Sequence, residues 1–178
     1  MKKILLKDES VYTDLVNHVV IDRALLKDRI LFSAYIAQDR VNPRPFRPGY
    51  HHFKIEGSQP YSWLIDYVRQ HYQVEFNNPF LKMHDLYGSL LLPREQSLKR
   101  NHKKEKNPPD YIMIYGVDVD KDSSVIIETR DKRGIEELSL FKIKNNHFLL
   151  FPAYLRFFIN ENTSFHTNVF LTTTYITV

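Results

Sequence analysis

The chain ends in Asn146-His147-Phe148-Leu149-Leu150-Phe151-Pro152-Ala153-Tyr154-Leu155-Arg156-Phe157-Phe158-Ile159-Asn160-Glu161-Asn162-Thr163-Ser164, followed by the run Phe165 to Val178. His147 to Phe151 is an apolar run before a proline, and it predicts a strand. The run Phe165 to Ile176 includes the stretch Asn168 to Tyr175 and predicts a further strand. The C-terminal part of the chain is therefore expected to be β structure.

Strand candidates also fill the sequence before this stretch. The segment Tyr111 to Tyr115 alternates in the way that strands do, and turn residues such as Asp120-Lys121-Asp122 and Asn145-Asn146 separate neighbouring runs. The other strands that we expect are Ile30 to Ile36, Tyr50 to Ile55, Leu81 to Leu92, Tyr111 to Val119, Ser124 to Thr129 and Leu138 to Ile143.

One helix is expected after Pro60, because proline suits a first helical turn. The apolar residues that follow lie on one face at helical spacing, and this face should pack on a sheet; they are Trp63, Leu64, Tyr67, Val68 and Tyr72. Leu15 to Leu26 is a candidate for a second, short helix. A helix followed by six or more strands predicts an α+β fold, mostly β, with an antiparallel sandwich.

The composition limits the classes of protein to consider. A chain of 178 residues suits one domain, since a domain of this size buries roughly 70% of its unfolded-chain surface. No cysteine is present, which excludes disulfides, thiolate metal sites and cysteine nucleophiles and is typical of a reducing compartment. No window approaches the ~20 apolar residues of a membrane span. We therefore expect a soluble protein with no membrane partner.

Two polar segments are the candidates for contacts with partners. The three prolines of Asn42 to Gly49 force an extended or turning segment, which we interpret as an arm or a long loop. Lys99 to Lys106 contains five cations and one histidine, and Pro108-Pro109 follows it. This run is expected to be a solvated loop. The alternatives are that it contacts an acidic protein surface or that it contacts phosphate.

Nucleic acid is not an expected partner, because no aromatic residue lies between Lys99 and Lys106 to stack on a base. The residues that we consider as contacts with protein partners are Pro43, Pro45, Phe46, Pro48, Lys99, Lys103, Lys104 and Lys106.

From Phe80 to Thr177, the order of segments resembles that of the small Fe(II)/2-oxoglutarate oxygenases of the prolyl-hydroxylase type that phage genomes often carry. Gln96 to His102 stands where this family has a polar segment that ends in a His-x-His or His-x-Asp pair. The segments that resemble its core strands and its Phe-Pro turn are Leu81 to Leu91, Tyr111 to Val117, Ser124 to Arg130 and Asn146 to Ser164. The resemblance implies a double-stranded β-helix, or jelly roll, with one or two flanking helices.

The chemistry of this family requires two histidines and a carboxylate, or three histidines, on one face of an iron ion. By position, the resemblance implies Arg100 and His102 as the paired ligands and Phe157 as the third. Only His102 can bind a metal. The far carboxylate of 2-oxoglutarate would be held at Asn168, or at His166 with another gap placement, and neither offers the forked geometry of arginine. We therefore interpret these as degenerate positions and expect no metal and no cofactor.

Other arrangements of histidine fit a metal no better. No histidine of the chain has a His, Asp or Glu two positions away, the spacing at which strand side chains point the same way. The neighbours His51 and His52 would point to opposite faces of a strand. A triad gathered from His84, Asp85 and His147 is the alternative that remains.

Asp118, Asp120 and Asp122 alternate as at the start of a calcium loop. However, Ser123 and Thr129 stand where that motif needs a glycine and a glutamate, which favours an acidic hairpin turn. Phosphate-loop, dinucleotide-binding and nucleophile-elbow motifs are absent from the sequence.

The sequence predicts a single domain over residues 1–178, with N-terminal strands, the Pro-rich arm and a helix in 1–79 and the jelly-roll core in 80–178. The expected function is that of a non-catalytic, oxygenase-like structural or assembly subunit. The resemblance implies the virion of a tailed phage as its setting, in the neck, tail or baseplate.

The expected partners are other protein subunits, with no small-molecule substrate. The expected location is the virion or the host cytoplasm if the protein is phage-encoded, and otherwise the cytoplasm. The alternative is an active dioxygenase that depends on Fe(II) and 2-oxoglutarate and whose ligands the alignment misses.

Overall fold

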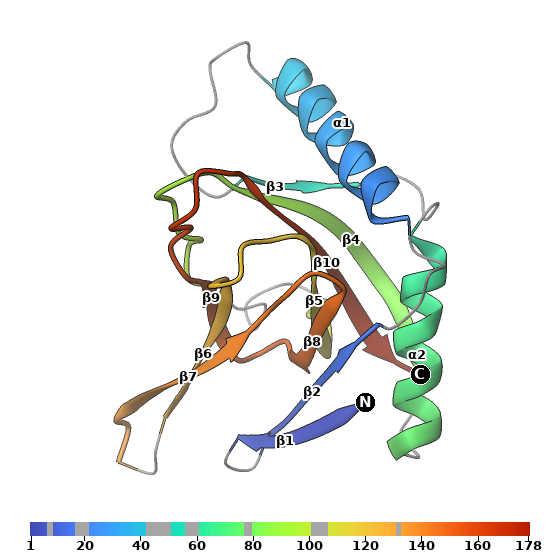
Figure 1. Cartoon of the computed structure of the whole chain (residues 1–178). Helices are drawn as coiled ribbons and strands as arrows, with labels where there is room; N and C mark the ends of the chain where they lie inside the picture. The colour runs from blue at the N-terminus through green and yellow to red at the C-terminus, as the bar shows by residue number, and fades with distance from the viewer. Residues whose placement is uncertain are drawn as a thin grey trace.

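The computed structural model describes residues 1–6, 9–16, 22–41, 51–55, 61–76, 80–100, 107–130 and 133–178. Within these ranges, two helices lie on one side of a large sheet and a small sheet lies on the other (Figure 1). The elements are β1 (Lys2–Leu6), β2 (Glu9–Leu15), α1 (Arg23–Val41), β3 (His51–Lys54), α2 (Ser62–Phe76), β4 (Leu81–Leu91), β5 (Tyr111–Asp118), β6 (Ser124–Arg130), β7 (Glu136–Lys142), β8 (His147–Pro152), β9 (Arg156–Ile159) and β10 (Asn168–Thr177).

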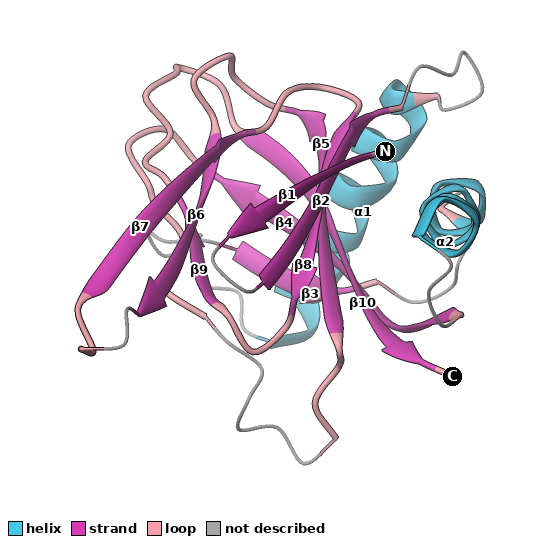
Figure 2. Cartoon of the chain, turned by 90° about the horizontal axis from the view of Figure 1, so that it is seen from below, coloured by secondary structure: helices cyan, strands magenta, loops and turns pink. Residues whose placement is uncertain are grey.

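The larger sheet has the order β1-β2-β8-β5-β10-β4-β3, and each neighbouring pair is antiparallel. The smaller sheet has the order β7-β6-β9 and is also antiparallel. The two sheets face each other, as Figure 2 shows from below. The fold is thus the mostly β, double-stranded β-helix that the sequence predicts, with two flanking helices.

The structure has two apolar cores. Successive side chains of β10 point to opposite faces of the large sheet, so this strand contributes to both cores. Val169, Leu171 and Tyr175 point toward the helices and join one buried cluster. Phe170 points the other way and joins the cluster between the two sheets. Nearly all of β10 is buried because both of its faces are covered, which explains why its sequence is apolar or β-branched with little alternation.

Helix α2 confirms the predicted helix after Pro60. Leu64, Ile65, Val68 and Tyr72 are buried in the core on the helix side of the large sheet. Trp63 and Tyr67 are partly buried against the same core. The spacing in the sequence therefore identifies the correct face.

Helix α1 shows that the strand predicted over Ile30 to Ile36 is wrong. Asp22 caps the helix, since its Oδ1 accepts a hydrogen bond from the Leu25 backbone N–H at 3.0 Å. Residues 26, 30 and 34 recur at helical spacing and are buried. The other side of the helix exposes large apolar side chains as well, which hides the helical period in the sequence; they are Leu25, Leu31, Phe32 and Tyr35.

The short helix predicted over Leu15 to Leu26 is wrong at its start, because Leu15 is the last residue of β2. Residues 17–21 lie outside the described ranges, and residues 23–26 belong to α1. Strands β1 and β2 extend the large sheet beyond β8, and β3 extends it beyond β4. No helix in the described part of the chain is long and apolar enough to cross a bilayer.

Candidate functional site

Arg100 and Phe157, two of the three degenerate metal positions, lie directly opposite each other. Phe157 is the second residue of β9, and Arg100 forms a β-bridge with it. The Arg100 N–H donates to the Phe157 carbonyl at 2.9 Å, and the Phe157 N–H donates to the Arg100 carbonyl at 3.0 Å. Residues that are 57 positions apart in sequence are thus brought together where the resemblance implies an iron site.

The side chain of Phe157 fills the space between the two sheets. It is 4% exposed and meets the ring of Phe151 edge to face, with the ring centroids 5.1 Å apart. Its neighbours in this core are aliphatic and aromatic side chains from both sheets, among them Ile112, Ile127 and Ile159. A phenyl ring has no lone pair to offer a metal, so this position is a packing position.

Asn168, the degenerate co-substrate position, is the first residue of β10 and is 3% exposed. Its Oδ1 accepts from the Asp120 backbone N–H at 2.8 Å, and its Nδ2 donates to Ser123 Oγ at 2.9 Å. Both ends of the amide therefore hold the turn between β5 and β6. The alternative residue, His166, is exposed.

The alternative triad of His84, Asp85 and His147 does not come together. His84 and Asp85 lie on β4 and His147 on β8, with β10 and β5 between these strands. Three steps between strands correspond to about 14 Å. Among the described residues, no group of three or more His, Asp or Glu side chains is placed to hold a metal ion.

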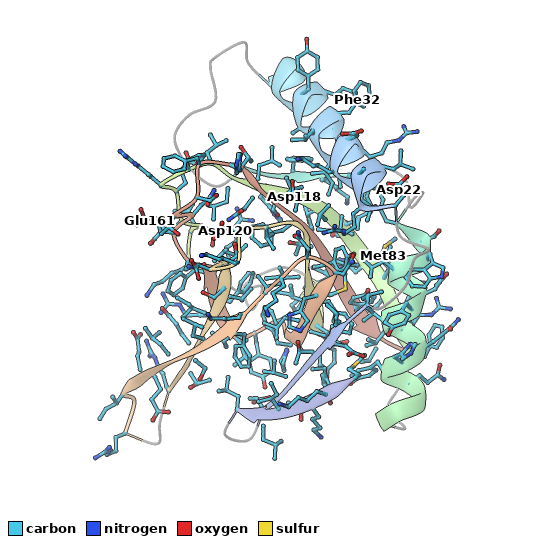
Figure 3. The ribbon with its side chains drawn as sticks, viewed as in Figure 1. Asp22, Phe32, Met83, Asp118, Asp120 and Glu161 are labelled. Carbon is cyan, nitrogen blue, oxygen red and sulfur yellow. The ribbon has the colours of Figure 1, made fainter. Side chains whose placement is uncertain are left out.

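Acidic residues cluster at the end of β5, where Figure 3 labels Asp118 and Asp120. Asp120 Oδ1 accepts from the Asp122 backbone N–H at 3.0 Å, and Asp118 forms an ion pair with Lys27 of α1 at 2.6 Å. The predicted acidic turn is therefore present, but the predicted hairpin is wrong, because β5 belongs to the large sheet and β6 to the small one.

A buried carboxylate lies on the outer face of the small sheet. The Glu128 side chain on β6 is 3% exposed and lies between Lys99 and Arg156. Lys99 Nζ pairs with Glu128 Oε1, and Arg156 Nε lies 3.4 Å from Glu128 Oε2. We call these three residues the Glu128 cluster.

The Glu128 cluster continues toward the edge of the sheet. Glu136 lies 3.0 Å from Arg130 and 3.6 Å from Arg156. The hydrogen bond from Arg130 holds the pKa of the Glu136 carboxyl below its usual value. A cavity of about 290 Å³ adjoins these side chains and is also lined by Thr129 and Tyr154. Sequence patterns do not predict this cluster, because the register between β6 and β9 sets Glu128 opposite Arg156.

Most of the residues considered as partner contacts lie outside the described ranges: Pro43, Pro45, Phe46, Pro48, Lys103, Lys104 and Lys106. His102, the third degenerate metal position, also lies outside them. Of the partner-contact residues, Lys99 is described, and it lies half-exposed in the Glu128 cluster.

Comparison with known proteins gives a clear result for structure and none for sequence. No protein-family model matches the chain, and no curated protein matches it in sequence. Its fold is similar to that of the α-ketoglutarate-dependent carbocyclase SnoK from nogalamycin biosynthesis, with a TM-score of 0.69, 9% identity, and coverage of 94% of this chain and 79% of SnoK.

Two prolyl hydroxylases have the same fold. The viral collagen prolyl hydroxylase of Paramecium Bursaria Chlorella virus-1 gives a TM-score of 0.61 at 7% identity, covering 94% of this chain and 96% of that one. The Pseudomonas putida prolyl-4-hydroxylase gives 0.58 at 11% identity, covering 96% and 94%. The chain therefore has the fold of the Fe(II)/2-oxoglutarate oxygenases.

At the positions that the resemblance assigns to iron and 2-oxoglutarate, the described side chains offer no metal ligand and no positive charge for the co-substrate. Arg100 and Phe157 supply no metal ligand, and Phe157 is packed against Phe151 inside the barrel. Asn168 carries no positive charge for a carboxylate, and the β5–β6 turn occupies both polar ends of its side chain. The fold is that of an oxygenase, whereas these positions have the chemistry of a core.

Proposed function

We propose that the chain is an oxygenase-fold protein without iron or 2-oxoglutarate chemistry and that it serves as a structural or assembly subunit. The observation that carries this proposal is the burial of Phe157 at the position that the resemblance assigns to the last iron ligand. Loss of that ligand alone leaves the facial triad incomplete. The function then lies in the surfaces of the barrel.

The setting that we propose is the virion of a tailed phage, in its neck, tail or baseplate, with other protein subunits as partners. Support for this setting comes from the order of segments, which resembles that of phage-borne oxygenases. The Pro-rich arm Asn42 to Gly49 and the basic run Lys99 to Lys106 are the contact segments in this proposal.

An active oxygenase is the competing function, because the proteins of similar structure are described as enzymes of this class. Thermal unfolding separates the two. A ligand that binds only the native state stabilises it, by about 2.7 kcal/mol when its concentration is 100 times its Kd. We expect Mn(II) plus 2-oxoglutarate to leave the unfolding midpoint of this chain unchanged while raising that of a prolyl hydroxylase used as control. A rise that requires both additives together would contradict the proposal.

A further inference from the structure

Strand β7 (Glu136–Lys142) forms an open edge of the small sheet. In the described part of the chain it pairs with β6 and with no other strand. Figure 2 shows it on the outside of the molecule. Leu138 and Leu140 are 62% and 59% exposed, and they lie on the same face of the strand because they are two residues apart. An edge strand that exposes leucines tends to pair with another chain unless something blocks it.

The direction of the backbone groups on β7 follows from two hydrogen bonds. The Ile143 N–H donates to the Ser123 carbonyl at 3.0 Å, whereas the Ser124 carbonyl accepts from Asn160 on the opposite side of β6. Hydrogen-bonded and non-hydrogen-bonded pairs alternate along an antiparallel ladder. In the β6–β7 register, Ser139 and Ile127 therefore form a hydrogen-bonded pair, and the backbone N–H and C=O of Ser139 point toward β6. The N–H and C=O groups of Leu138 and Leu140 point toward the open edge.

We propose that β7 pairs antiparallel with β7 of a second copy of this chain, about a two-fold axis that passes beside Ser139. In this register Leu138 of one copy faces Leu140 of the other, and its outward backbone groups meet those of Leu140. Glu136 faces Lys142 of the second copy, which places opposite charges together at both ends. The two small sheets join into one continuous sheet through an isologous contact.

The sequence of β7 favours this register over its neighbours. An axis beside Leu138 would set Leu140 against Glu136, and an axis beside Leu140 would set Leu138 against Lys142. Each of these places a leucine opposite a charge. Only the axis beside Ser139 pairs leucine with leucine and glutamate with lysine.

The inference deepens the proposed assembly role, on which its biological meaning rests, by naming the partner as a second copy. Its test involves neither iron nor 2-oxoglutarate. If β7 does not pair, the proposal that the chain lacks iron and 2-oxoglutarate chemistry is unaffected. If the chain binds iron, the proposed pairing of β7 is likewise unaffected.

The first test is a cross-link at the axis. The chain has no cysteine, so Ser139→Cys introduces a unique thiol. Residues that face each other in a non-hydrogen-bonded pair have Cα atoms about 4.5 Å apart, a separation that a disulfide spans. We expect Ser139→Cys to form a covalent dimer on mild oxidation and Lys82→Cys, on β4, to stay largely monomeric. Equal cross-linking of the two variants would overturn the proposal.

The second test removes one outward donor. Leu140→Pro deletes an N–H that points away from β6, which an edge strand tolerates, and Leu140→Ala removes the same side chain but keeps the N–H. By sedimentation equilibrium, we expect the proline variant to have a dimer Kd on the order of 30-fold higher than the alanine variant, because one hydrogen bond per copy is lost. Equal Kd values, or a wild-type protein that stays monomeric at all concentrations, would overturn the proposal.

Discussion

Arg100 and Phe157 exchange two backbone hydrogen bonds, at 2.9 and 3.0 Å, across the open edge of β9. This pairing brings together two positions that the resemblance assigns to iron ligands, although they are far apart in sequence. The side chains at that place are a guanidinium and a buried phenyl ring. Neither of these two side chains can supply a metal ligand.

Truncation of Phe157 should destabilise the fold strongly. Because Phe157 is 4% exposed and packs on Phe151, Phe157→Ala should lower the free energy of unfolding by about 3–5 kcal/mol. The neighbouring Phe158 is only partly buried, so Phe158→Ala is a matched control with a smaller loss. Urea unfolding of both variants checks this, and equal losses would show that Phe157 is not a core residue.

Asn168 should act as a clamp on the β5–β6 turn. Asn168→Ala leaves the Asp120 N–H and Ser123 Oγ without their partner and should cost about 1–3 kcal/mol. Ser123→Ala removes only one of the two contacts and should cost less. Amide hydrogen exchange at Asp120 would locate the effect, and unchanged protection there in Asn168→Ala would argue against the clamp.

Removing a positive charge from the Glu128 cluster should lower the free energy of unfolding more than removing its negative charge. Lys99→Met leaves a carboxylate that is 3% exposed with Arg156 as its remaining ion-pair partner, which should cost about 2 kcal/mol. Glu128→Gln leaves two half-exposed cations that water can solvate, and should cost about 1 kcal/mol or less. Chemical unfolding of both variants gives the order, and a larger loss for Glu128→Gln would contradict the account.

His147 should make stability depend on pH. Burial lowers the pKa of His147 from its ordinary value of 6.5, so the unfolded chain binds this proton more readily than the native protein does. Its stabilising contribution is therefore present above pH 6.5 and is lost as pH falls through the folded pKa. We expect His147→Gln to reduce the loss of stability in this interval, as thermal unfolding at a series of pH values would show. An unchanged pH profile in His147→Gln would mean that other groups cause the loss of stability at low pH.

Apart from β9, the strands from β4 onward could be predicted because turns separate runs of β-branched and aromatic residues. Strand β9 could not, because Arg156–Ile159 follows a Phe-Pro turn closely and is only four residues long. Helix α1 was missed for a different reason. Its exposed side carries Phe32 and Tyr35 as well as charged residues, so apolar residues are not confined to one face and the helical period is weak.

The candidate site residues differ in how far the sequence predicts their positions. The order of segments singled out Arg100, Phe157 and Asn168, and the structure pairs Arg100 with Phe157. The Glu128 cluster depends on the register between β6 and β9 and on the segment that ends at Arg100. No local pattern in the sequence encodes that register.

The most direct measurement is the absorption spectrum of the purified protein with Fe(II) and 2-oxoglutarate under anaerobic conditions. A charge-transfer band arises only when both occupy one site. The account predicts no band for the folded protein, because Phe157 and Asn168 belong to the packed interior. A band that appears with both additives, and is lost when either is left out, would contradict it.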